Sequence, residues 1–355
     1  MQAPNGGESK FSYKQNSFIP REATKSVIWA VEEAIAESLD VKSLLSSTTT
    51  FRIADLGCSI GPNTFDHVET VINAVKLKLQ SQALASKTLD FQVFFNDLPS
   101  NDFNTLFRSL PHAGGRGYYA CGIPDSFYCR LFPNSSLHFA HCLHAVQYLS
   151  RVPPELLDKA SPAFNRGRVS YVNAPRAVED AYVRQFDEDL ETFLGFRAQE
   201  IVVGGMIVVL VKVAPSGVSH SATPHGFFHV LMNSALEDMV KDGLVSQDKV
   251  DLCNIPAYAG TPEQWRGALE RSKSFKIEKF VVSSIEQSVA PLPMNPQIIV
   301  FHFRAVLEGI LAVYFDQEVI DELFDRLLEK ASRASMGIQA SGAGAYQLFI
   351  ALKRV

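Results

Sequence analysis

IADLGCSIGPN, residues 53–63, is the stretch of sequence that decides the fold of this chain. An apolar run ends there in an acid and a turn of small residues, as at the carboxyl end of a buried strand. Gly57 and Gly61 have no Cβ, so bare backbone can approach a ligand closely. Pro62 suits the first turn of a helix whose N–H groups face that turn. The stretch predicts a strand, a ligand-binding turn and a helix.

The spacing of the two glycines indicates which ligand the turn suits. It is G-x-x-x-G, which matches neither the dinucleotide pattern G-x-G-x-x-G nor the phosphate pattern G-x-x-x-x-G-K-[ST]. A third nucleoside cofactor, S-adenosylmethionine, fits the turn better. An ordinary strand-to-helix turn punctuated by glycine is the alternative.

Composition excludes several classes of partner. The net charge is −5, from 33 Lys+Arg against 38 Asp+Glu, and no basic block occurs. We therefore expect neither nucleic-acid binding nor attachment to a membrane. The longest apolar run, Met206 to Val211, ends at Lys212 and is too short to span a bilayer. The first residues are polar and the five cysteines include no C-x-x-C pair, which predicts a cytoplasmic protein with reduced thiols.

Apolar segments alternate with helical patterns over the first 215 residues. The expected helices are Phe65 to Leu79 and Val178 to Gly195, whose apolar residues follow a helical spacing. The expected strands are Thr50 to Asp55, Asp90 to Asn96, Leu137 to His141, Arg168 to Asn173 and Gly205 to Val213. This alternation predicts an α/β fold with a mostly parallel sheet and helices on both faces. Ligands on such sheets bind at the carboxyl ends of the strands, where Gly57 and Asp97 are expected.

The pattern changes after a Gly/Ser/Pro linker at Ser216 to Pro224. Helices are expected at Phe228 to Val240 and Val300 to Lys330, and two further strands at Phe275 to Ser284 and Tyr346 to Leu352. We therefore predict a core of residues 1–215, 270–285 and 341–355. A helical cap of residues 216–269 and 286–340 is expected to cover the substrate site, and the small residues Ala340 to Ala345 are expected to form a loop.

Two further segments carry groups that suit a nucleoside. Asp97, in the string FFNDLPSNDFN, ends the second strand, where a carboxylate can accept hydrogen bonds from both hydroxyls of a ribose. A helix cap is the alternative role for this aspartate. Ser126 and Phe127 lie in a turn where a ring and a hydroxyl can hold a purine, although such a turn by itself is common.

The string LHFAHCLHAVQYLS at 137–150 contains His138, His141, His144 and Cys142. Strand alternation places His138 and His141 on opposite faces, which disfavours a zinc site. The better interpretation is a strand end from which polar side chains enter a cofactor and substrate cleft. Hydrolase chemistry has no support, because a G-x-S-x-G elbow is absent.

These strings together resemble the SABATH family of plant S-adenosylmethionine-dependent methyltransferases. The specific matches are IADLGCSIGPNTF at 53–65, FQVFFNDLPSNDFNTLFRSLP at 91–111, SFYCRLFP at 126–133 and RAQEIVVGG at 197–205, with Tyr13-x-x-Asn16-Ser17 near the start. The resemblance covers nearly the whole chain. It implies a class I methyltransferase fold with a Rossmann-like sheet and an α-helical cap, a homodimer, and methyl transfer to a carboxylate or a ring nitrogen of a small molecule.

The resemblance also implies roles for individual residues. Cofactor contacts are expected from Tyr13, Gly57, Cys58, Asn63, Asp97, Leu98, Ser126 and Phe127. Substrate contacts are expected from Asn16, Pro20, His144, Gln147, Tyr148, Phe228, His229, Tyr258, Phe303 and Val306, with His144, Gln147 and Tyr148 as the candidate catalytic residues. Some relatives bind an accessory Mg²⁺, whose ligands here would be Asn173, Asp251, Cys253 through its carbonyl, and Asn254.

The sequence departs from the family where the acceptor binds. Carboxylate-specific members usually carry a glutamine at the position of Pro20 and an indole at the position of Tyr148. Gln147 and Tyr148 can instead donate an amide N–H and a phenol O–H to a carboxylate. We therefore predict methyl-ester formation on a small hydrophobic acid.

The alternative acceptor is an amine or a phenol. A carboxylate is ionised at pH 7 and needs no base, whereas an amine or phenol would need His144 or His229 to remove its proton. A binding protein that has lost catalysis is a further alternative.

Overall fold

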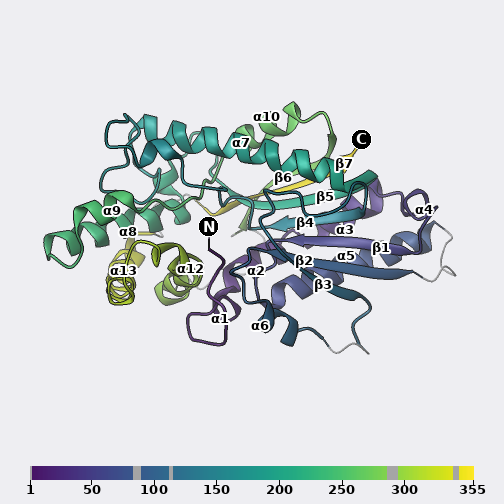
Figure 1. Cartoon of the computed structure of the whole chain (residues 1–355), viewed down its shortest axis with the longest axis horizontal. Coiled ribbons are helices and arrows are strands. Elements are labelled where there is room, and N and C mark those ends of the chain that lie inside the picture. The colour runs from purple at the N-terminus through teal and green to yellow at the C-terminus, as the bar shows by residue number, and fades with distance from the viewer. Residues whose placement is uncertain (1, 83–88, 112–114, 286–294, 339–343) are drawn as a thin grey trace.

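The computed structural model describes residues 2–82, 89–111, 115–285, 295–338 and 344–355. Seven strands form a single sheet in the order β3-β2-β1-β4-β5-β7-β6 (Figure 1). The strands are β1 (Thr50–Leu56), β2 (Asp90–Asp97), β3 (Tyr119–Pro124), β4 (Leu137–Leu143), β5 (Ile201–Val213), β6 (Phe275–Ser284) and β7 (Tyr346–Arg354). Strands β1 to β5 pair in parallel, and β7 runs antiparallel between β5 and β6. The predicted α/β fold with a mostly parallel sheet is confirmed.

Helices cover both faces of the sheet, as the alternating pattern predicted (Figure 1). On one face, α7 (Arg176–Glu200) and α10 (Pro262–Arg271) bury their apolar sides against β4, β5 and β7. On the other face lie α3 (Ile28–Ser38), α4 (Val41–Leu44) and α5 (Pro62–Ser81). Because both faces are buried, the central strands are apolar almost throughout, which is why they were recognisable in the sequence.

A third apolar cluster lies apart from the sheet. It is built by α8 (Pro224–Lys241), α9 (Gln247–Leu252), α12 (Pro296–Leu311) and α13 (Gln317–Ile338), which gather at one end of the molecule (Figure 1). We propose that these four helices are the cap. Helix α10 was assigned to the cap by its position in the sequence, yet Trp265 and Leu269 pack in the cluster on the α7 face of the sheet. The predicted loop at 340–345 falls largely outside the described residues.

The first residues of the chain connect the sheet side to the cap. The Ala3 N–H donates to Ser100 Oγ at 3.1 Å and the Gly7 N–H to Asp102 Oδ2 at 3.0 Å. Asn5 bonds the cap, because its N–H donates to the carbonyl of Ala305 at 2.7 Å and its amide to Glu308 at 2.6 Å. The short helices α1 (Tyr13–Asn16) and α2 (Phe18–Lys25) follow this N-terminal segment of residues 2–7.

One predicted strand is wrong. Residues 168–173 form turns and bends in the structure. Val169, Tyr171 and Val172 are buried between α7, α8 and the 253–258 segment, so their apolar pattern reflects burial without strand pairing. The carbonyl of Val169 accepts a hydrogen bond from Ile255 N–H at 2.7 Å, and Asn233 Oδ1 accepts from the Val169 N–H at 3.1 Å. Strand β3 and the four N-terminal helices were not predicted.

None of the helices that the structure describes combines the length and apolar character needed to span a bilayer.

Candidate active site

The loop between β1 and α5 is shaped for close approach of a ligand. Gly57 has φ +85°, and a Cβ at this position would lie 2.4 Å from the Cβ of Ala145, so no other residue fits. The N–H groups of Gly57 and Cys58 both donate to the carbonyl of Asn96, at 2.9 and 3.0 Å, which fixes the loop to the end of β2. Gly61 precedes α5 with Pro62 at its first turn, as predicted.

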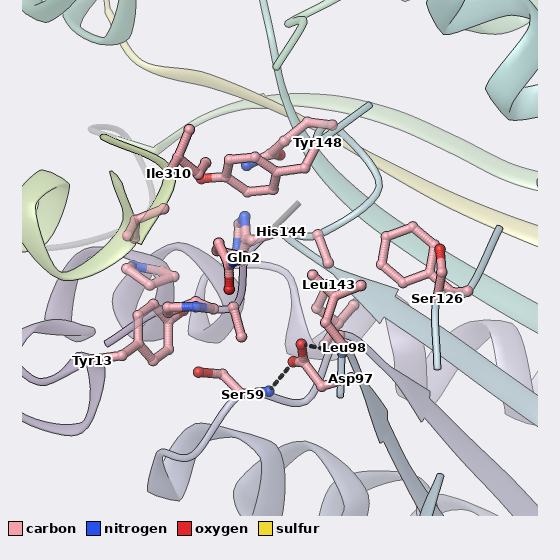
Figure 2. Close-up of a pocket in the computed structure, with 18 of the residues that line it drawn as sticks. Gln2, Tyr13, Ser59, Asp97, Leu98, Ser126, Leu143, His144, Tyr148 and Ile310 are labelled. Carbon is pink, nitrogen blue, oxygen red and sulfur yellow. Dashed lines mark hydrogen bonds between the residues drawn. The ribbon is translucent and has the colours of Figure 1, made fainter. Parts of the chain in front are cut away.

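Asp97 ends β2 and faces the cavity beside this loop. Its two carboxylate oxygens accept the backbone N–H groups of Ser59 at 2.7 Å and Leu98 at 2.8 Å (Figure 2). Burial raises the pKa of this carboxyl to about 6, although both N–H donors oppose the shift. The helix-cap alternative does not apply to Asp97, because Asp102 is the residue that caps α6 (Phe103–Arg108), accepting from the Thr105 N–H.

The turn after β3 forms another wall. The side-chain amide of Asn96 donates to the carbonyls of Ile123 and Asp125, both at 2.8 Å. A fully buried arginine on α7, Arg197, donates to the carbonyl of Phe127 at 2.9 Å. The ring of Phe127 packs edge-on against Phe193 of α7. Hydrogen bonds from two sides therefore hold this turn in place.

Eleven of the predicted site residues line one cavity at the carboxyl ends of the strands. They are Tyr13, Pro20, Gly57, Asp97, Leu98, Ser126, Phe127, His144, Gln147, Tyr148 and Val306. Figure 2 shows Tyr148 and Ile310 on one side of the cavity, with Asp97 and Ser59 on the other. The strand ends supply one wall and α12 of the cap supplies part of the opposite wall.

Three residues that were expected to contact the cofactor or the substrate do not line the cavity. They are Cys58, Asn63 and Asn16. The thiol of Cys58 is buried, and this burial raises its pKa. The Asn63 amide donates to the carbonyl of Ser17 at 3.2 Å, while its Oδ1 is buried without a hydrogen bond. The side-chain amide of Asn16 donates to the carbonyls of Lys10 and Ser12, so this side chain holds the turn before α1 instead of lining the cavity.

Four predicted substrate residues also lie outside the lining. Phe228 stacks on Phe303, with ring centroids 3.6 Å apart and an interplanar angle of 6°. The Nε2 atom of His229 lies 3.2 Å from that of His225 on the same helix. Tyr258 is buried and its hydroxyl bonds Gln264. These side chains form the layer behind the acceptor wall.

The two histidines of β4, His138 and His141, form contacts inside the sheet. His138 accepts a hydrogen bond from the Arg52 N–H at 3.0 Å and stacks on Phe51. His141 Nε2 lies 3.1 Å from Asp55 Oδ1, deep below the glycine loop. Both belong to the sheet interior, whereas His144, Gln147 and Tyr148 from the same string line the cavity. No group of three His, Cys, Asp or Glu side chains suited to a metal occurs among the described residues.

His144 does reach the cavity, and its protonation is constrained. Thr24 Oγ1 donates to the carbonyl of Pro20 at 2.9 Å, so the His144 Nε2 atom, 3.2 Å away, must donate to that hydroxyl. Burial and, to a smaller extent, the nearby charge of Lys212 lower the pKa of His144 to about 3. The imidazole is therefore neutral at pH 7. Tyr148 is neutral as well, because burial raises its pKa to about 12.

None of the four expected Mg²⁺ ligands is among the residues that line the cavity. Asp251 is the one carboxylate among the four, and its Oδ1 accepts from the Gly167 N–H and from the Gln247 amide, both at 2.7 Å. Asn254 Oδ1 accepts from Asn165 at 2.8 Å, and Asn173 has φ +56°. Cys253 is fully buried. The side-chain oxygens of Asp251 and Asn254 that would bind Mg²⁺ therefore already accept hydrogen bonds within the protein. Mg²⁺ binding stays a prediction.

Several lining residues were missed in the sequence. They are Gln2, Ala3, Pro4, Ser59, Tyr128, Leu143, Ala145, Lys212, His302 and Ile310. Lys212 carried a signal, because it interrupts the longest apolar run of the chain. The N-terminal residues carried none.

The fold and cavity define a class I S-adenosylmethionine-dependent methyltransferase. A glycine-lined turn, an aspartate after β2 and a ring-and-hydroxyl turn after β3 suit the methionine, ribose and adenine parts of that cofactor. The donor set therefore fits S-adenosylmethionine.

Comparison with known proteins identifies the family. The model of the SAM-dependent carboxyl methyltransferase family matches residues 1–355, and this chain belongs to that family, also known as SABATH. Loganic acid O-methyltransferase of Catharanthus roseus is 40% identical over 90% of this chain and 85% of its own length. A 7-methylxanthine methyltransferase of Camellia ptilophylla is 35% identical over 91% and 90% respectively.

A solved structure gives the same result. A loganic acid methyltransferase with SAH superposes with a TM-score of 0.93 at 38% identity, covering 99% of this chain and 98% of that one. The resemblance to SABATH methyltransferases and the class I fold are confirmed, and S-adenosylmethionine is the methyl donor.

Proposed function

We propose that this enzyme forms methyl esters on a small hydrophobic carboxylic acid. The observation that carries the proposal is the weak basicity of the histidines that line the cavity. Burial lowers the pKa of both His144 and His302 to about 3, far below the pH at which a general base is effective. A carboxylate, with an ordinary pKa near 4, is already ionised and needs no base.

The charges of the lining residues support the same acceptor. Asp97 is the only carboxylate among the described residues that line the cavity, and it lies on the cofactor side. A cationic amine would therefore find no partner at the acceptor wall. Val306, Ile310 and the ring of Tyr148 supply the apolar surface that an acid with a hydrocarbon body requires.

We assign the residues of the cavity as follows. S-adenosylmethionine supplies a methyl group on a positively charged sulfur. Asp97 holds the ribose hydroxyls, Ser126 and Phe127 hold the adenine, and Tyr13 and Gly57 border the amino acid end. Gln147 and Tyr148 orient the acceptor. The neutral imidazole of His144 forms part of the surface against which the acceptor lies. Methyl transfer then depends on proximity and alignment, which contribute up to about 7–11 kcal/mol in favourable cases.

Transfer to nitrogen or to a phenol oxygen is the second candidate function. Its support is the replacement of the expected glutamine by Pro20, together with the kinship to a 7-methylxanthine methyltransferase. His144 Nδ1, which is buried without a hydrogen bond, would be the base. The low pKa of this imidazole argues against that role.

An acceptor panel with labelled S-adenosylmethionine separates the two. It contains loganic acid, benzoic acid and a longer aliphatic acid, each beside its amide, together with 7-methylxanthine and a simple phenol. We expect label, and a gain of one methylene in mass, on acids alone. Label confined to 7-methylxanthine or the phenol would overturn the carboxylate assignment.

The remaining expectations are also proposals. We propose a homodimer in the cytoplasm. Light scattering after size-exclusion chromatography tests the dimer, and a fluorescent fusion tests the compartment. Calorimetric titration of Mg²⁺ against the wild type and Asp251→Asn tests the metal, since a binding isotherm lost in the variant is the expected result.

A further inference from the structure

Lys212 places a positive charge in the cavity. It lies near the carboxyl end of β5, where it lines the cavity and keeps part of its surface accessible through it. No carboxylate lies within ion-pair distance of its ammonium among the described residues. The other buried cations are paired, because Arg197 contacts Glu200 at 2.8 Å and Arg304 contacts Glu308 at 3.2 Å.

Among the residues that the structure describes, the groups near the Lys212 ammonium are aromatic or neutral at pH 7. Its Nζ lies 5.7 Å from the centre of the Phe303 ring. Four histidines are close enough for its charge to lower their pKa values: His144 after β4, His225 and His229 on α8, and His302 on α12. All four are neutral at pH 7. Burial lowers the pKa of Lys212 itself to about 8, so most molecules carry the charge at pH 7.

A largely desolvated charge without a partner destabilises the fold, and a ligand that supplies the counter-charge removes that cost. Resting on the ester-forming function proposed above, we propose that the Lys212 ammonium binds the carboxylate of the acceptor, together with the hydrogen-bond donors of Gln147 and Tyr148.

The location of Lys212 favours the acceptor over the cofactor. The cofactor wall consists of the β1, β2 and β3 ends. The Lys212 Nζ instead lies 5.7 Å from the centre of the Phe303 ring, and its charge lowers the pKa values of histidines on α8 and α12. The carboxylate of the methionine part would lie by Tyr13 and Gly57. The test must therefore also detect the alternative, in which Lys212 binds the cofactor.

The proposal explains how the product leaves. A carboxylate oxygen forms a bond to the methyl carbon, the carbon–sulfur bond breaks and its electron pair stays on sulfur. The acceptor becomes a neutral ester and no proton is gained or lost. The ester no longer attracts the ammonium, so Lys212 binds substrate more tightly than product.

The test compares Lys212→Met and Lys212→Arg with the wild type. Lys276→Met is the matched control, because this lysine is exposed on β6. Calorimetry with S-adenosylhomocysteine present measures the Kd of the panel acid with the fastest wild-type turnover, and of its amide. S-adenosylmethionine is titrated separately, and kcat and KM are measured for the acid.

We expect Lys212→Met to raise the acid Kd and KM about 10-fold or more, as loss of a buried charge partner does. Its Kd values for the amide and for S-adenosylmethionine should stay within about twofold, and Lys212→Arg should retain part of the acid preference. Removal of an unpaired buried charge should also raise Tm, and Lys212→Gln gives a second neutral variant if Lys212→Met folds poorly.

Three results would overturn the inference: unchanged acid binding, equal losses for acid and amide, or weakened S-adenosylmethionine binding. Loss of phenol turnover through kcat alone would make Lys212 a base and overturn it as well. If the wild type methylates no acid, the proposed function fails and the inference falls with it. If the wild type methylates an acid that Lys212→Met binds equally well, the inference alone fails.

Discussion

Gly57 is the residue whose conformation most directly controls the cofactor site. A methyl group there would have to share space with the Cβ of Ala145, and its positive φ is strained for any other residue. Strain of this kind costs about 1–3 kcal/mol. We therefore predict that Gly57→Ala lowers S-adenosylmethionine affinity at least 10-fold, measured by calorimetry, and lowers Tm.

Gly61 provides the matched control for this prediction. Its φ is −90°, and an added Cβ would meet Ser17 Oγ at an ordinary 3.5 Å. Gly61→Ala should bind S-adenosylmethionine nearly as the wild type does. Equal losses in the two variants would show that the loop needs flexibility in general and not the backbone conformation of Gly57.

Asp97 predicts a pH dependence of cofactor binding. Burial raises its pKa to about 6 in the ligand-free protein, so the carboxylate takes up a proton as the pH falls through that value. A protonated carboxyl accepts ribose hydroxyls poorly. S-adenosylmethionine affinity should therefore fall from pH 7 to pH 5 in the wild type.

In Asp97→Asn the affinity should be low at both pH values and change little between them. Asp102→Asn is the control, because that carboxylate caps α6 and does not line the cavity. A pH dependence that persists in Asp97→Asn would assign the titration to another group.

At the scale of elements, the end of α7 supports the purine wall from behind. Arg197 donates to the carbonyls of Phe127 and Cys129, both at 2.9 Å, and Glu200 accepts the N–H of Leu131 at 2.6 Å. Arg197→Met would leave Glu200 buried without its counter-charge. We predict a loss of about 3–5 kcal/mol in the free energy of unfolding, measured by denaturant titration.

Arg184→Met is the control for this element, since Arg184 pairs with Glu155 in an exposed position on the same helix. Its effect should stay within about 1 kcal/mol. A small effect of Arg197→Met as well would mean that water or a rearranged turn replaces the guanidinium.

The whole fold was predictable where burial imposes a simple pattern. Strands β1, β2, β4 and β5 are covered on both faces, and their apolar runs are correspondingly continuous. The Arg168 to Asn173 segment is equally apolar but is buried by the cap, and sequence does not distinguish the two kinds of burial. Strand β3 was missed because it is an edge strand in which no position is fully buried, so its sequence lacks a continuous apolar run.

The residues of the candidate site also divide into those that the sequence predicted and those that it did not. Residues in the loops after β1, β2 and β3 were predictable because their chemistry is local to one short string. Gln2, Ala3 and Ile310 reach the cavity only through tertiary packing. Lys212 was visible as the charge that ends an apolar run, but only the fold shows that no carboxylate among the described residues pairs with it.

The N-terminal segment has a consequence for turnover. Asn5 bonds α12, while Ala3 and Gly7 bond the loop after β2, so the segment ties the acceptor wall to the cofactor wall. These hydrogen bonds lie at least partly at the surface, where each contributes about 1 kcal/mol. We therefore expect that these walls can separate only when the first residues detach, so that detachment would precede the exchange of S-adenosylhomocysteine and ester for new reactants.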